Sequence, residues 1–150
     1  MSLAEQIKHD LEQAVRQRNS LSCSTLRMLL SSIHNAEIQK QHKALDDAGI
    51  IEIVVKEAKQ RRESIEAYEK GNRPDLVAQE KSELEILTGY LPKQMSRDEI
   101  IAAAKKIIAD IGAKEPGDKG KVMGQLMPQT KGKADGKEVS DIVSELLSNP

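Results

Sequence analysis

The chain has 150 residues and a net charge of −1, with 38% hydrophobic residues but only two tyrosines and no phenylalanine or tryptophan. That length can bury an aliphatic core in one or two small domains without disulfides or metals. The single cysteine, Cys23, excludes an internal disulfide and leaves too few thiols for a zinc or iron–sulfur site. No apolar run approaches the roughly 20 residues of a membrane span, so we expect a soluble, cytoplasmic protein.

Apolar residues recur at helical spacing through most of the N-terminal half. A first helix carries them over residues 3–15 and a second over residues 26–33. A third helix begins after Asp46 or Asp47, either of which can cap it, and Gly71 is its natural stop.

A fourth helix follows, with Asn72 as its cap, Pro74 in its first turn and an apolar seam along one face. The seam consists of Val77, Leu84, Leu87 and Leu91. Pro92 breaks the helical pattern, and we place a domain boundary there, with domains over residues 1–92 and 93–150.

Three helices are predicted in the second domain. Ser96 and Glu99 form a capping box for the first, which Gly112 ends. A short second helix covers residues 118–127 and closes at Pro128. The last helix carries the clearest apolar stripe, formed by Val139, Ile142, Val143, Leu146 and Leu147. Since no alternating segment of useful length occurs, the sequence predicts an all-α fold with an N-terminal four-helix region and a small three-helix domain.

Positive charge is concentrated in residues 119–137. Five lysines against one aspartate give this segment +4, so the rest of the chain sums to −5. Ammonium groups beside glycines, whose backbone can approach a ligand closely, are typical of phosphate binding and indicate a polyanion-binding segment. The candidate contact residues are Lys119, Gly120, Lys121, Gly124, Lys131, Gly132, Lys133 and Lys137.

A structural interpretation of this segment stays open. Gly132 and Gly136 can simply shape a turn between two helices, with the lysines present for solubility. The P-loop pattern is absent, which argues against nucleotide hydrolysis. If the ligand is RNA, the lack of Phe and Trp argues against stacking of unpaired bases, so a folded RNA such as a tRNA is the expected partner.

The other reactive or basic residues have structural interpretations. Cys23 is expected to be small and half-buried, and Arg61 and Arg62 to form salt bridges within their acidic helix. Residues expected to pack beneath the basic segment against the last helix are Met123, Leu126 and Met127. The histidines lack metal-ligand spacing and are expected at the surface. They are His9, His34 and His42.

Several motifs resemble, in order and spacing, those of the YqeY family. In the C-terminal half they are Gly120-Lys121-Val122-Met123-Gly124, Leu126-Met127-Pro128, Lys131 to Gly136 and the final helix from Val139 to Leu147. In the N-terminal half they are Thr25 to Leu29, Lys59 to Glu63, Tyr68-Glu69 with Asp75-Leu76-Val77, and Leu91 to Gln94. The resemblance covers essentially the whole chain.

The C-terminal part of this family is similar to the tail domain of GatB, the B subunit of glutamine-dependent aspartyl/glutamyl-tRNA amidotransferases. The resemblance implies contact with the outer corner of tRNA. The matching positions are Lys121, Lys131, Lys133, Gly120, Gly124 and Gly132. Ser140 departs from the asparagine expected in most relatives, which puts in doubt only a local cap or turn contact.

Such families are often labelled carbon–nitrogen ligases with glutamine as amido-N-donor. The chain lacks the amidase nucleophile region and the kinase-like cradle that this chemistry requires. We therefore expect a tRNA-binding accessory module, working with an amidotransferase or another tRNA-processing enzyme, with no catalytic residue, metal or cofactor of its own. Two alternatives stay open: a component of a carbon–nitrogen ligase, and a protein–protein adaptor that uses the apolar seam.

Overall fold

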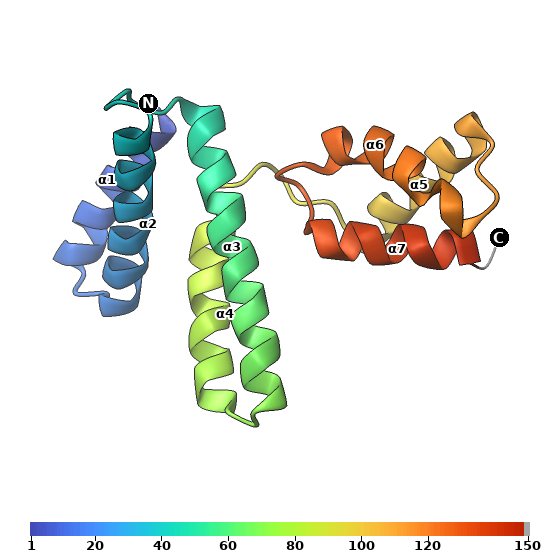
Figure 1. Cartoon of the computed structure of the whole chain (residues 1–150). Helices are drawn as coiled ribbons and strands as arrows, with labels where there is room; N and C mark the ends of the chain where they lie inside the picture. The colour runs from blue at the N-terminus through green and yellow to red at the C-terminus, as the bar shows by residue number, and fades with distance from the viewer. Residues whose placement is uncertain (149–150) are drawn as a thin grey trace. The chain divides into compact units, whose positions relative to one another are not determined.

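The computed structural model describes residues 1–148, and this part of the chain consists of helices and short connections without a strand, as the sequence predicts (Figure 1). The chain divides into two compact units, Met1–Leu91 and Pro92–Pro150. No helix in the described part of the chain is both long and apolar enough to cross a membrane.

The first unit contains α1 (Leu3–Arg16), α2 (Ser20–Gln39), α3 (Asp47–Lys70) and α4 (Pro74–Thr88). Each of the first three begins at a polar side chain that accepts a backbone amide: Ser2 for α1, Asn19 for α2 and Asp46 for α3. Helices α3 and α4 run side by side as a long antiparallel pair (Figure 1). The core of the unit is formed by Ile7, Leu26, Leu29, Ile33, Ile50, Val54 and Leu87.

The connection from α3 to α4 differs in part from the prediction. Gly71 is the C-cap of α3, as expected. Asn72 adopts a left-handed conformation with φ of 54° and does not cap α4, which Arg73 precedes without a side-chain cap. The helix ends at Thr88, so Leu91 of the predicted seam lies beyond it.

An ionic cluster joins α3 and α4. Arg61 Nε lies 3.2 Å from a carboxylate oxygen of Glu83 and 3.6 Å from one of Glu80. Burial raises the pKa of Glu80, because desolvation disfavours the charged form. The prediction that Arg61 pairs within its own helix is wrong, because α4 supplies both carboxylates across the helix pair.

The second unit contains α5 (Arg97–Ile111), a 3-10 turn η1 (Pro116–Asp118), α6 (Lys119–Thr130) and α7 (Gly136–Ser148). The capping box of Ser96 and Glu99 opens α5, as predicted. Gly112 ends α5 with φ of 68°, a left-handed conformation that glycine adopts without steric cost.

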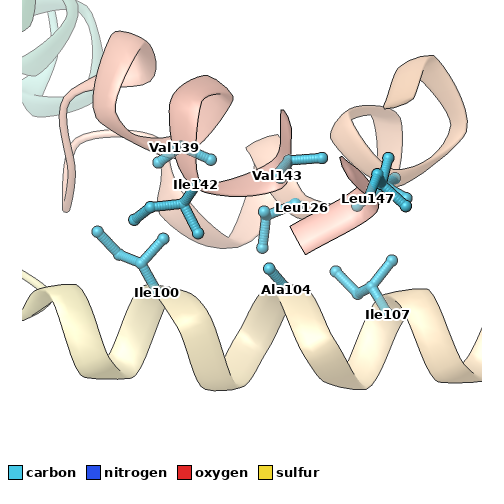
Figure 2. Close-up of a cluster of buried hydrophobic side chains, with 9 residues drawn as sticks. Ile100, Ala104, Ile107, Leu126, Val139, Ile142, Val143 and Leu147 are labelled. Carbon is cyan, nitrogen blue, oxygen red and sulfur yellow. The ribbon is translucent and has the colours of Figure 1, made fainter. Parts of the chain in front are cut away.

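A fully aliphatic cluster holds these helices together. Figure 2 shows Ile100, Ala104 and Ile107 of α5 facing side chains of α6 and α7. The facing residues are Val122, Leu126, Val139, Ile142, Val143 and Leu147. This packing follows the predicted stripes, and it determines which face of α6 is turned outward.

Helix α6 is longer than the sequence predicts. Pro128 does not close it, and the helix continues to Thr130. Proline lacks an N–H, so Pro128 removes one helical bond, to the carbonyl of Gly124, but the residues after it can still bond to earlier carbonyls. The Lys131 N–H still donates to the Met127 carbonyl at 2.9 Å, and buried Thr130 lies next to the Leu126 carbonyl.

Candidate nucleic-acid interface

The basic segment predicted from the sequence forms α6, the turn after it and the first turn of α7. Val122, Leu126 and Thr130 recur every four residues and are buried, so they form the inner side of α6. The opposite side carries Gly120, Gly124 and further exposed residues. The lysines at 121, 131, 133 and 137 are exposed, and the lysine at 119 is half-buried.

The five lysines form two groups rather than one patch. Lys119 and Lys121 lie in the first turn of α6, whereas Lys131, Lys133 and Lys137 surround the turn that leads into α7. Helix α6 has 12 residues, which corresponds to a length of about 18 Å. The groups therefore lie at opposite ends of the helix and can contact separate anionic groups.

The first turn of α6 carries two lysines, and Asp118 at the cap position interacts electrostatically with Lys121. That turn contains no acidic residue, and Asp118 makes no side-chain capping bond. The Asp118 carboxylate instead accepts the backbone N–H groups of Lys114 and Glu115, at 3.1 and 3.3 Å. These bonds lower the pKa of Asp118 and hold the loop before α6. A helix N-terminus attracts anions, and two lysines in its first turn strengthen that attraction.

The turn between α6 and α7 is fixed by residues that the sequence analysis did not single out as anchors. The Gln94 side-chain amide donates to the Gly132 carbonyl at 2.9 Å, and the Met95 N–H donates to the Lys133 carbonyl at 2.8 Å. The N–H of Lys133 donates to the Thr130 carbonyl at 2.8 Å. The bonds of Gln94 and Met95 join segments almost 40 residues apart, and no local pattern indicates them.

Gly132 has a clear structural role. It is buried and has φ of 77°, a conformation that L side chains rarely adopt. The structural interpretation of this glycine as a turn residue is therefore correct. Gly136 is the first residue of α7, and a Cβ there would lie 3.9 Å from Met127 Cε, an ordinary contact.

Gly120 and Gly124 have no such role. A Cβ added at either position would meet no heavy atom within 4 Å, and neither residue has a left-handed backbone. Glycine in a helix interior costs about 0.5–1 kcal/mol relative to alanine. Nothing within the described chain explains this cost, and the bare backbone on this side of α6 is open to close approach.

Several lysines of the basic segment make no close ion pair with an acidic side chain of the described chain. None of the ion pairs among residues 1–148 involves Lys119, Lys121 or Lys133. Lys131 and Lys137 each have an interaction with another group. Three of the five predicted contact lysines are thus exposed or half-exposed cations outside any close ion pair.

The predicted support beneath the segment is correct for two of its three residues. Leu126 is fully buried and Met123 is half-buried against the cluster. Met127 is 38% exposed, so the prediction that it packs inward is wrong. Relative to the buried row of Val122, Leu126 and Thr130, Met127 lies at the edge of the inward side, because each residue turns the helix by about 100°.

The other candidate residues are placed as follows. Cys23 is buried in α2, and all three histidines are exposed. Residues 1–148 contain no group of three or more His, Cys, Asp or Glu side chains arranged to hold a metal ion. At the centre of the apolar seam, Leu87 is 1% exposed and packs in the core of its own unit.

The chain is similar in sequence to a known protein family over almost its whole length. Residues 4–147 match the YqeY family, described as Yqey-like protein. The chain belongs to this family. The match includes both compact units and the whole of the basic segment.

Named relatives come from fungi. The Altered inheritance of mitochondria protein 41, mitochondrial, of Lachancea thermotolerans is 38% identical over 112 residues, which are 73% of this chain and 60% of that protein. Its counterpart in Kluyveromyces lactis is 36% identical over 113 residues, with the same coverage. The protein of that name in Pyrenophora tritici-repentis is 30% identical over 148 residues, or 94% of this chain and 78% of the relative. The chain thus spans about 60% of the length of the first two relatives.

These names correct the expected location. Each of the three relatives is named as a mitochondrial protein, which contradicts the prediction of a cytoplasmic one. That prediction relied on one cysteine and on the lack of a long apolar run. Neither feature distinguishes one aqueous compartment from another, so the inference had no physical basis for choosing the cytoplasm.

Alanine at Gly132 and at Gly124 should change stability in opposite directions. Gly132→Ala places a Cβ at a positive φ and should lower the free energy of unfolding by about 1 kcal/mol or more. Gly124→Ala enters open space and should raise it by about 0.5–1 kcal/mol. Hydrogen exchange of the α7 amides measures both effects in the full chain. A loss of protection in Gly124→Ala would show that this glycine is required within the fold.

Proposed function

We propose that this chain binds tRNA through α6, the α6–α7 turn and the first turn of α7, as an accessory module of tRNA amidation or of another tRNA-processing enzyme. The observation that carries the proposal is the pair of exposed glycines, Gly120 and Gly124, beside Lys119 and Lys121. The chain itself has no steric need for glycine at either position.

The local energetics favour an anionic ligand at the beginning of α6. Gly124 in the interior of α6 costs about 0.5–1 kcal/mol relative to alanine, and cations in a first turn interact unfavourably with the helix dipole. A phosphate placed there would pair with the lysines and with the positive end of the helix. Features that weaken the free protein would then strengthen the complex.

The lack of aromatic side chains in the basic segment favours a folded RNA over a single strand. The two groups lie about 18 Å apart along α6, so one RNA surface must present phosphates at both places. The chain contains no Phe or Trp and only two tyrosines, Tyr68 and Tyr90, both outside the basic segment. Recognition would therefore rely on phosphates and shape rather than on base stacking.

The resemblance of the C-terminal unit to the GatB tail supports tRNA as the folded RNA. It also supports an accessory role, because a tail that positions tRNA works for an active site held elsewhere. We assign no catalytic residue in this chain. Independent formation of amidated product from glutamine, ATP and misacylated tRNA by the purified chain would contradict this part of the proposal.

Replacing three lysines should weaken tRNA binding and reduce its salt dependence. In the variant Lys121→Ala/Lys131→Ala/Lys133→Ala, the slope of log affinity against log salt should fall by about 2–3, since each phosphate contact contributes about 0.7–0.9. Filter binding at several salt concentrations, with tRNA and a double-stranded RNA of equal length, measures this.

The matched control for this experiment removes the same charge elsewhere. Lys8→Ala/Lys40→Ala/Lys59→Ala changes three exposed lysines outside the basic segment and should leave the slope within experimental scatter. Equal effects of the two triple variants, or no preference of the natural protein for tRNA, would refute the proposed surface.

Alanine at the two exposed glycines tests close approach separately from charge. Gly120→Ala/Gly124→Ala keeps every lysine and should stabilise α6. It should nevertheless weaken tRNA binding by about tenfold, because two methyl groups would keep the RNA backbone from the helix. Unchanged tRNA affinity in this more stable variant would show that the ligand does not touch this side of α6.

A further inference from the structure

The C-terminal unit has a second candidate binding surface, which is formed by residues outside the basic segment 119–137. It is an apolar groove of about 570 Å³ between the C-terminal end of α5 and the last turns of α7. Its lining includes Ile108, Ala109 and Gly112 on the α5 side and Leu146 on α7. This volume is in the range of specific ligand sites.

The groove is open because its α5 side is lined by small residues. Ala109 and Gly112 bring almost no side-chain volume, and a Cβ at Gly112 would meet nothing within 4 Å. Leu146 and Ile108 are only half-buried and pack against the edge of the aliphatic cluster. An apolar partner could therefore extend that cluster without displacing any side chain.

The charged residues that line the groove have one sign. Lys105 and Lys114 are the charged residues in its lining, and both are exposed. Lys105, Ile108, Ala109 and Gly112 lie at the spacing i, i+3, i+4 and i+7, which is one stripe of a helix. Lys114 lies beyond the left-handed C-cap at Gly112, so one lysine lines the groove from α5 and the other from the segment after it.

We propose that this groove binds an acidic amphipathic helix of a partner protein. A helix laid in the groove would set two apolar side chains at i+3 and i+4 on the apolar lining, with carboxylates at i and i+7 available to Lys105 and Lys114. Charge complementarity with these two lysines favours an acidic partner. The proposal is independent of RNA binding, because none of the residues at 119–137 lines the groove.

The test uses synthetic peptides and the full chain. The probe is a fluorescein-labelled, alanine-based helix with glutamates at i and i+7 and leucines at i+3 and i+4. One control peptide has lysines in place of the glutamates, and another has alanines in place of the leucines. Fluorescence anisotropy should show binding of the probe and at least about tenfold weaker binding of each control.

Charge reversal supplies the matched protein variants. Lys105→Glu/Lys114→Glu should weaken binding of the acidic probe by at least about tenfold and should favour the lysine-bearing peptide instead. Lys106→Glu changes an exposed lysine that does not line the groove, and it should bind the acidic probe as the natural protein does. Amide shifts on binding should centre on residues 105–114 and Leu146.

Two outcomes would overturn the proposal. Equal effects of Lys106→Glu and of the double reversal would mean that the peptide responds to overall charge alone. Binding of dodecanoate at residues 105–114, with no binding of the acidic peptide, would identify a site for a fatty carboxylate instead.

Discussion

The burial of one side of α6 against α5 and α7 determines the rest of the C-terminal unit. Val122 and Leu126 enter a cluster built only from aliphatic side chains, and this fixes the rotation of the helix. The lysines and the exposed glycines of α6 then point away from the core. With no large ring to organise the interior, uniform packing of Ile, Leu and Val between three helices gives this orientation.

In the same unit, some exposed residues of α6 are unfavourable for the stability of the helix. Glycines stand in a helix where alanine would be more stable, and lysines occupy a first turn that favours carboxylates. By contrast, α5 begins with Asp98 and Glu99, which follow the rule. Sequences break such local rules most often at functional sites. The contrast between two neighbouring helices is the basis for placing the ligand on α6.

The fold could be predicted where the signal is local. The Asp46 cap, the Ser96–Glu99 capping box, the Gly112 stop and the apolar stripes of the second unit depend mostly on residues within about a turn, and the structure confirms them. Features set by distant residues could not be predicted in this way. Arg61 pairs with carboxylates from α4, and Gln94 holds the turn at Gly132. Met127 is a different case: neighbouring residues such as Ile142 and Val143 can both be buried, so the helical period alone does not determine the exposure of the residue next to Leu126.

The sequence identifies the residues of the candidate site but not their arrangement in space. Composition alone located the lysines, yet their division into two groups depends on the continuous helix through Pro128. The structure was also needed to tell the glycines apart. Gly132 adopts the positive φ of the turn, whereas a Cβ at Gly124 would meet no heavy atom within 4 Å.

The proposed contact of tRNA with the outward side of α6 and the turn after it is tested most directly by an amide NMR titration of the full chain with tRNA at moderate salt. If the contact forms there, the largest shifts and broadening occur at the amides of residues 117–137, with Gly120 and Gly124 among them, and residues 1–91 change little. Shifts centred on residues 1–91, or none at saturating tRNA, would contradict the proposed contact.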